Sequence, residues 1–482
     1  MWSKSAQIEH LCLKVNESHR KPQRSPNQKT QVIMEQSPKK HTGGNSKASA
    51  LRTRTAAHHV VRNVLAGDVL DVMLAKEARR DHDPRDMAFL KQLTMLYFKH
   101  LGSVRRVMRK MIERPIPTKA YKVQQIIELG LVQVLYMRTD DHAAVDQTVE
   151  MVAKLKHPQE VAMKGMANAV LRRVIREKEE TLAFIARDQA TDLAPWIKFR
   201  WAEQFGGKVV DAIGASLAGA VPIDLTPKNP DEAKAIAKAV DGFVMPTGSV
   251  RLKEATDITK LEGFEDGNWW VQDMAAAIPA TLFGNIEGKV VVDFCAAPGG
   301  KTMQLAAQGA SVVAVDRSLQ RLERLRENVA RTQFKDKVSV LVADATNWVP
   351  QMEIDHILLD APCSATGTLR RNPDVQWSKG LPEVNKLVKL QAEILDHAFT
   401  LLPVGGMLIY CVCSLEDEEG ATQIEDFLAK TPKAKLVPIR SRNVGGLNKL
   451  ATKEGYLQCR PDHLANKGGM DGFFAARIER IG

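Results

Sequence analysis

The chain has 482 residues, with 68 Lys and Arg against 57 Asp and Glu, and so a formal net charge of +11. Its 44% hydrophobic and 26% charged residues are close to globular averages, which excludes a collagen, a wholly disordered chain and a long coiled coil. No run approaches the ~18 consecutive apolar residues of a membrane-spanning helix. The length predicts roughly two to four domains.

The N-terminus lacks the apolar core of a secretory signal peptide. Six cysteines spread over this length do not suggest a disulfide framework. We therefore expect a cytoplasmic protein in a reducing compartment, with no membrane partner.

Residues 1–50 carry nine Lys or Arg and three Glu, a net charge of 9 − 3 = +6. This arm is too polar to pack, so we expect it to be disordered. A basic arm is typical of contact with a polyphosphate, and the alternative is a solvated tail without a partner. Met34 is a second candidate for the true start of the chain.

Residues 51–188 are predicted to form an all-α domain. Apolar residues recur at helical spacing in residues 56–78, 87–111, 121–137, 143–155 and 165–184. Breaks are expected at Asp83-Pro84, at the prolines 115 and 117, and at His157-Pro158. Residues 189–285 are predicted to hold a linker helix and a small α+β element rich in proline and glycine.

Residues 286–482 alternate short apolar strands with helices. We expect strands at residues 289–294, 312–316, 338–342, 356–360 and 407–411, with helices such as 319–331 and 384–402 between them. Continuous apolar strands alternating with helices predict an α/β domain with a parallel sheet covered on both faces.

The loop after the first of these strands is rich in small residues and opens a helix. It is not a phosphate-binding P-loop, because the required first glycine is Cys295, and the G-x-G-x-x-G dinucleotide motif is absent. Asp316, Asp344 and Asp360 each follow a later strand, at the sheet edge where open α/β sheets bind ligands. A nucleoside with a short cationic tail suits this row of acids, and S-adenosylmethionine is such a molecule.

Cys363 and Cys413 follow two neighbouring predicted strands. One alternative is structural, because a lone cysteine is usually a buried residue without a chemical role. A second alternative is a metal site, which we do not expect because the sequence has no C-x-x-C pair. Beside a methyl donor, a thiolate can add to carbon 6 of cytosine and activate carbon 5. We expect Ser414 and Asp417 to cap a helix whose N-terminus lowers the pKa of Cys413. Acids at 416–419 oppose this effect, so a cation such as Lys301 is needed.

These residues together resemble the Nol/Nop/Sun family of RNA 5-cytosine methyltransferases, over about residues 190–482. The resemblance implies a Rossmann-like S-adenosylmethionine-dependent methyltransferase domain with Cys413 as nucleophile. Cys363 would assist product release or proton handling, and Asp360 would hold the target base. The donor would be bound by Cys295, Ala296, Ala297, Pro298, Gly299, Gly300, Lys301, Asp316, Asp344 and Asp360. The motifs that carry the likeness are Gln272-Asp273, residues 293–302, Asp360 to Ser364, Arg370 to Asp374, Tyr410 to Ser414 and Asp471 to Phe474.

Residues 128–136, 142–145 and 166–173 are similar to the NusB-like RNA-binding domain of RsmB-type members of that family. Those enzymes methylate a cytosine in small-subunit ribosomal RNA. The resemblance therefore implies a monomeric enzyme with ribosomal RNA as partner and no metal cofactor. The alternatives are the same chemistry on transfer RNA or large-subunit RNA, and a ribosome-assembly factor without activity.

The chain departs from the family pattern at three places. Cys411-Val412 replaces the usual Ser-Thr before the nucleophile, and Asn372 replaces a usual His. Residues 223–227 lack the usual Leu-Arg-Val-Asn pattern, which leaves the RNA contacts of the small α+β element open.

Overall fold

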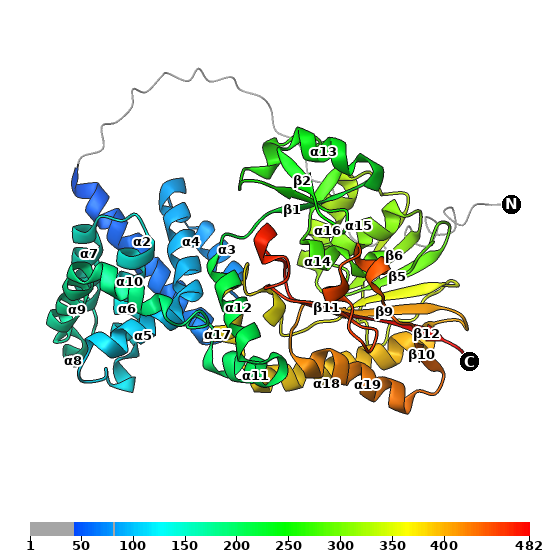
Figure 1. The fold of residues 1–482 in the computed structure, drawn as a ribbon. Helices are drawn as coiled ribbons and strands as arrows, with labels where there is room; N and C mark the ends of the chain where they lie inside the picture. Colours follow the sequence, from blue (N-terminus) through cyan, green and yellow to red (C-terminus); the bar gives the residue numbers. More distant parts are fainter. Residues whose placement is uncertain (1–42, 81) are drawn as a thin grey trace, which may run out of the picture.

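The structure, a computed structural model, describes residues 43–80 and 82–482 (Figure 1). Most of the basic arm therefore lies outside the described residues. Helix α2 (Gly43–Leu65) includes residues 43–50, so the arm boundary predicted at residue 50 is wrong. Ser49 donates a hydrogen bond of 2.5 Å to Asp86, which ties this end of α2 to the domain. No helix of the described chain is long and apolar enough to cross a membrane.

The predicted all-α domain is confirmed, and it forms one half of the molecule in Figure 1. Two predicted stretches are each a pair of helices. Residues 56–78 break at Gly67, where φ is +109°, and residues 87–111 break at His100. The helices are α2, α3 (Leu70–Ala78), α4 (Pro84–Lys99), α5 (Leu101–Met111), α6 (Tyr121–Tyr136), α7 (Asp141–Ala153), α8 (Pro158–Val161), α9 (Lys164–Arg176) and α10 (Lys178–Ala186).

Helices α11 (Pro195–Phe205) and α12 (Gly207–Ala218) connect this domain to the rest of the chain. A small antiparallel sheet follows, in the strand order β2-β3-β1-β4. Arg251 and Asp224, both buried, form an ion pair of 2.6 Å within it, and Arg251 also donates to the carbonyl of Gly469. The small sheet is therefore fixed to the C-terminal segment. Its elements are β1 (Asp224–Pro227), α13 (Ala233–Ala239), β2 (Gly242–Val244), β3 (Val250–Leu252) and β4 (Trp269–Val271).

The larger sheet has the strand order β10-β12-β9-β8-β5-β6-β7, with β11 beside β12. The five predicted strands are confirmed and pair in parallel. The sequence analysis missed β10, β11 and β12, which extend the sheet with antiparallel strands. The strands are β5 (Val290–Phe294), β6 (Ser311–Asp316), β7 (Val338–Val342), β8 (His356–Asp360), β9 (Met407–Val412), β10 (Ala434–Leu436), β11 (Leu457–Cys459) and β12 (Phe473–Arg480).

Helices cover both faces of this sheet, as predicted. Val292 and Phe294 of β5 share a core with α18 (Leu381–Leu401) and α19 (Ala421–Lys430). Val291 points to the other face and packs with α15 (Gly300–Ala307) and α16 (Leu319–Arg331). Successive side chains of a strand alternate between faces, so the uninterrupted apolar run of β5 serves two cores.

The all-α domain contacts the α/β part of the chain at α17 (Val375–Ser378). The indole of Trp377 donates to the carbonyl of Phe98 at 2.9 Å, and the guanidinium of Arg105 lies over the same ring. The amide of Leu70 donates to Asp374 at 3.4 Å. The start of α3 therefore lies beside the loop of residues 370–374.

Candidate active site

The loop after β5 makes a tight turn into α15. Cys295 has φ +60° and Gly299 has φ +104°. A Cβ on Gly299 would lie 2.9 Å from Leu325 of α16. Both this close approach and the positive φ require glycine at this position. The amide of Ala297 donates to Asp316 at 3.2 Å, which joins the loop to the end of β6.

The three predicted acids lie together at one sheet edge. Asp316, Asp344 and Asp360 line one cavity of about 310 Å³ with Cys295. Hydrogen bonds from the backbone and hydroxyl of Thr346 hold the pKa of Asp344 below its usual range. Carboxylates in this position can accept from ribose hydroxyls and attract a cationic tail, so the cavity fits the predicted donor. The other predicted loop residues lie elsewhere: Ala296, Ala297, Pro298, Gly300 and Lys301 line a second, wider cleft.

Cys363 and Cys413 lie side by side because β8 and β9 are neighbours in parallel register. Their sulfur atoms are 3.5 Å apart. The hydrogen bond from Cys363 lowers the pKa of Cys413 although burial opposes it, and the same hydrogen bond and burial raise the pKa of Cys363 well above its usual value. One sulfur therefore favours the thiolate and the other stays protonated.

The expected helix N-terminus at Cys413 is not found. The short helix η6 (Asp417–Glu419) starts after Glu416, and α19 starts at Ala421. Ser414 accepts from the amide of Glu416 at 3.0 Å, so the predicted capping box with Asp417 is wrong. Glu416, the residue before η6, instead pairs with Arg200 at 2.8 Å.

Lys301 supplies the cation that the sequence analysis required. Its ammonium lies 2.8 Å from Asp360 and over the ring of Phe473. Burial works to lower the pKa of Lys301, but Asp360 and the nearby thiols raise it above its usual value. Its charge in turn helps to lower the pKa of Cys413.

A Lys301→Met variant is expected to make Cys413 less acidic. A cation stabilises the thiolate, so its removal raises the pKa, and the thiolate then forms only at higher pH, by roughly 1 unit. Alkylation of the Cys413 peptide with iodoacetamide, followed by mass spectrometry across pH, measures this shift. Lys289→Met, which removes a lysine paired with Asp355, is the matched control. Equal midpoints in both variants would contradict the role of Lys301.

Cys411, the extra thiol, is buried 3.6 Å from Asp360. Burial raises the pKa of Cys411 well above its usual value, so its thiol stays protonated. The second departure, Asn372, lies in the wide cleft and donates to Thr368 at 3.0 Å. Neither departure displaces the Cys363 and Cys413 sulfurs.

The wide cleft has a volume of about 880 Å³ and meets the smaller cavity at Cys413. Asp360 also lines both spaces, and Lys301, Arg371 and Lys379 line the wide one. A molecule in the smaller cavity and a second molecule in the wide cleft would therefore both reach Cys413. No group of three or more His, Cys, Asp or Glu within residues 43–80 and 82–482 is arranged to hold a metal ion.

The sequence analysis missed Asp293 as a residue of this cleft. Thr302 donates to one carboxylate oxygen of Asp293 at 2.5 Å, and the other oxygen has no partner in the described chain. Burial raises the pKa of Asp293 to about 7. The sequence did offer one indication of this role: Asp293 lies one residue before the end of β5, close to the ligand-binding edge of the sheet.

The sequence analysis also missed Glu419, which joins the two thiol-bearing loops. Glu419 is fully buried and accepts from the amide of Ser364 at 2.8 Å and from Gln391 at 3.0 Å. The hydroxyl of Ser364 donates to its other oxygen and lies 3.1 Å from the hydroxyl of Ser414. Ser364 and Ser414 directly follow Cys363 and Cys413, so Glu419 fixes the spacing of the sulfurs.

Replacing Glu419 with alanine is expected to destabilise the fold. The substitution leaves the buried Ser364 amide without an acceptor, at roughly 1–3 kcal/mol. It also removes one of the two acceptors of the Gln391 amide, which still donates to the carbonyl of Pro362 at 2.9 Å. Urea unfolding measures the loss. Glu425→Ala on the exposed side of α19 should change stability by no more than about 0.5 kcal/mol. Equal stability of the two variants would show that Glu419 does not hold the loops.

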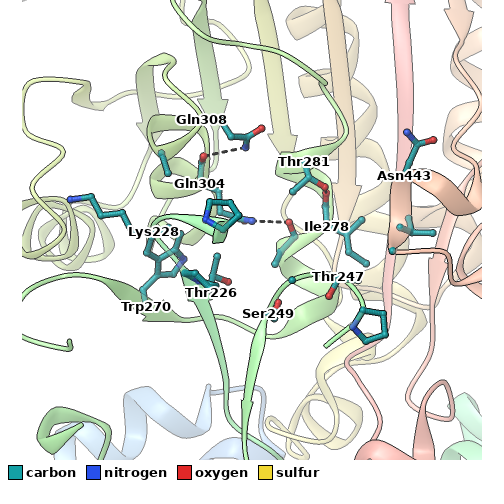
Figure 2. Close-up of a pocket in the computed structure, with 18 residues that line it drawn as sticks. Thr226, Lys228, Thr247, Ser249, Trp270, Ile278, Thr281, Gln304, Gln308 and Asn443 are labelled. Atoms are coloured by element: carbon teal, nitrogen blue, oxygen red, sulfur yellow. Dashed lines mark hydrogen bonds between the residues drawn. The ribbon is translucent and has the colours of Figure 1, made fainter. Parts of the chain in front are cut away.

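A separate cavity of about 320 Å³ lies between the small sheet and α15 (Figure 2). Thr226, Ser249 and Trp270 line one side of it. Figure 2 shows Gln304 and Gln308 on another side, where Gln304 donates to the carbonyl of Ala277. None of the predicted site residues lines this cavity, so it is not the candidate active site.

Comparison with known families agrees with both halves of the chain. The model of the NusB family matches residues 51–176, and the model "16S rRNA methyltransferase RsmB/F" matches residues 280–479. "Ribosomal RNA small subunit methyltransferase B" of Cronobacter sakazakii (strain ATCC BAA-894) is 34% identical over 437 residues, which cover 88% of this chain and 97% of that protein. The protein of the same name from Pasteurella multocida (strain Pm70) is 32% identical over 447 residues, covering 89% and 96%.

Solved structures share the fold. "Crystal Structure of PH0851" superposes with a TM-score of 0.67 at 21% identity, covering 89% of this chain and 99% of that one. "The crystal structure of NSun6 from Pyrococcus horikoshii with SFG" has a TM-score of 0.50 at 18% identity, covering 60% and 98%. Since relatives of 34% identity match along almost their whole length, the chain belongs to the RsmB/F family of 16S rRNA methyltransferases.

Proposed function

We propose that this enzyme methylates carbon 5 of a cytosine in 16S ribosomal RNA, with S-adenosylmethionine as methyl donor. The observation that carries the proposal is the position of Cys413, where the two cavities meet, with its sulfur 3.5 Å from that of Cys363. The named relatives are small-subunit ribosomal RNA methyltransferases, which supports the choice of RNA. The proposal includes a monomeric, cytoplasmic enzyme.

The chemistry uses Cys413 as nucleophile. Its thiolate adds to carbon 6 of the cytosine, which makes carbon 5 electron-rich enough to attack a methyl group. Bound S-adenosylmethionine supplies that methyl group. The sulfonium sulfur keeps the electron pair of the broken methyl bond, so the donor leaves as S-adenosylhomocysteine. Water in the wide cleft then takes the carbon 5 proton, and the C–H electron pair re-forms the ring double bond as the carbon–sulfur bond breaks and Cys413 leaves as a thiolate.

Cys363 and Asp360 act on either side of this step. Cys363 keeps its proton and can donate a hydrogen bond to the Cys413 sulfur as it leaves carbon 6, which assists product release. Asp360 accepts from the exocyclic amine of the cytosine in this proposal, and its contact with Lys301 at 2.8 Å supports the role by fixing the carboxylate. Because the reacting atoms are inaccessible in a stacked base, the cytidine must be extruded into the wide cleft.

The donor is assigned to the smaller cavity, with the adjoining loop as one wall. Asp316 and Asp344 bind its hydroxyls and polar groups, and Cys295 lines the same space. The loop residues from Ala296 to Lys301 hold the turn that shapes this edge. The NusB-like domain is assigned to RNA binding, because Val69, which precedes α3, and Asp71 of α3 line the wide cleft.

Mapping 5-methylcytosine by bisulfite sequencing in total RNA, with and without the gene, tests the proposal. We expect one 16S position to lose its mark without the gene and to regain it with purified enzyme and donor. Loss of 5-methylcytosine from transfer RNA or 23S RNA instead would show that this RNA, and not 16S RNA, is the substrate. No lost mark, together with no binding of S-adenosylmethionine in calorimetry, would favour an assembly factor without activity.

A further inference from the structure

The segment of residues 370–374 has no role in the chemistry described above, although it borders the active site. Two of its charged side chains form hydrogen bonds with other parts of the chain. Arg370 donates to the carbonyl of Gly468 at 2.7 Å, and Asp374 accepts from the amide of Leu70. Arg371, Asn372 and Asp374 all line the wide cleft with Cys413, and Arg371 is the cation among them.

Arg371 is exposed but firmly held. Its side chain is 42% exposed, whereas that of its partner Asp471 is 1% exposed. Nε of Arg371 donates to Asp471 Oδ2 at 2.8 Å, and Nη2 donates to the same oxygen. Within the described chain, Nη1 has no hydrogen-bond partner. One edge of the guanidinium is therefore fixed, and the other is free in the cleft.

The backbone on both sides of the Asp471 side chain is anchored by hydrogen bonds. The amide of Asp471 donates to Asp273 at 3.2 Å, and the amide of Gly472 donates to the carbonyl of Gly367 at 2.8 Å. Gly367 in turn donates to the carbonyl of Cys413 at 3.0 Å. A Cβ on Gly367 would lie 2.1 Å from the carbonyl oxygen of Gly472, so this close approach requires glycine. Arg371 and the nucleophile thus belong to one rigid unit.

The other cations nearest the sulfurs have partners. Lys301 is paired with Asp360 at 2.8 Å, and Lys379 donates to the carbonyl of Ser364 at 2.8 Å. A guanidinium with one fixed edge loses little freedom on binding, and its planar donors match the oxygens of a phosphate. A cytidine extruded into the cleft must bring its flanking phosphates with it.

We propose that Arg371 binds the backbone phosphate next to the extruded cytidine, and that Asp471 positions it. The inference rests on the proposed function, since it needs an RNA whose target base enters this cleft. Arg371 then sets how far the nucleotide enters, and so the approach of carbon 6 to Cys413. Asp471 is a positioning residue, because it acts through Arg371.

The salt dependence of RNA binding tests the phosphate contact. We expect Arg371→Ala to weaken binding of unmethylated 16S RNA roughly tenfold and to reduce the slope of log affinity against log salt by about 0.7–0.9, the value for one phosphate. Arg326→Ala, an exposed arginine of α16 outside both cavities, is the control and should keep binding and turnover. An unchanged slope, with either normal or reduced turnover, would overturn the phosphate assignment.

A double variant separates positioning from simple structural support. Asp471→Asn keeps the size of the side chain and should weaken binding less than Arg371→Ala, with a smaller change in slope. In the double variant, Asp471→Asn should add no further loss, because its effect passes through Arg371. Additive losses would overturn the positioning role. If Asp471→Asn fails to fold, Arg371→Lys, which keeps the charge without the planar fork, should still bind more weakly than wild type.

These outcomes are distinct from failure of the proposed function. The slope is measured on binding alone, before any methyl transfer. Wild-type enzyme that transfers no methyl group to carbon 5 would remove the proposed function. Full activity and an unchanged slope in Arg371→Ala would remove only the inference about Arg371.

Discussion

A Cys413→Ala enzyme is expected to lose methyl transfer by roughly 10⁴-fold or more, while its affinity for S-adenosylmethionine stays close to wild type. Without the thiolate, carbon 5 of cytosine is too weak a nucleophile to take the methyl group. The donor is unaffected because the acids of the smaller cavity are untouched. Transfer of tritium from labelled donor to 16S RNA and calorimetry with the donor measure the two quantities.

The control for this loss is Cys459→Ala, which removes a buried thiol on β11 outside both cavities. It should keep activity within a few-fold of wild type. A Cys413→Ala enzyme with full transfer would show that the RNA is methylated without this thiolate. Loss of donor binding in the same variant would show that the substitution had disturbed the donor cavity.

The second large effect is expected from Cys363→Ala, which should accumulate a covalent enzyme–RNA complex. Cys363 lies 3.5 Å from the nucleophile and keeps its proton, so it can stabilise the Cys413 thiolate as it leaves carbon 6. Without it, adduct formation should outpace release. The measurement is a band that survives denaturing electrophoresis and appears only with RNA and donor.

The double variant Cys363→Ala/Cys413→Ala should form no such complex, because the attacking sulfur is gone. A complex that persists in the double variant would place the covalent bond on another residue. Wild-type turnover without accumulation in Cys363→Ala would mean that product release does not need the second thiol.

Much of the fold of the methyltransferase domain was predictable, because buried strands appear in the sequence as short continuous runs of apolar residues. The strands at β5 and β9 are apolar runs that serve two cores, and their ends place Cys295 and Cys413 at one edge. Parallel neighbours then bring Cys363 to Cys413. The strand periodicity and the short motifs were sufficient for this part.

The missed features depend on contacts between distant segments. Strand β12 was missed because its apolar run, Phe473 to Ala476, is short, and Arg477, Glu479 and Arg480 interrupt the rest of the strand. Glu419 lies in a run of acids that suggests a solvated surface, yet it is fully buried against Ser364. Its role follows only from the packing of α18 and β8 against η6.

The predicted helix cap at Ser414 failed for a related reason. The local pattern of a serine followed three residues later by an acid is a typical helix start. Here Arg200 of α11 binds Glu416 and Glu418, a long-range contact that the local pattern does not include, and the segment forms only the short helix η6. The thiolate at Cys413 is favoured instead by Cys363 and Lys301, which a local pattern does not reveal.

The most direct test of the account is to trap the enzyme on 16S RNA that contains 5-fluorocytidine at the mapped position. Fluorine at carbon 5 cannot leave as a proton does, so the adduct persists after methyl transfer. Digestion and mass spectrometry should then find the nucleotide, with its methyl group, on the peptide of Cys413. An adduct on Cys363 or Cys411, or methylation of the natural RNA without any trapped adduct, would contradict the account.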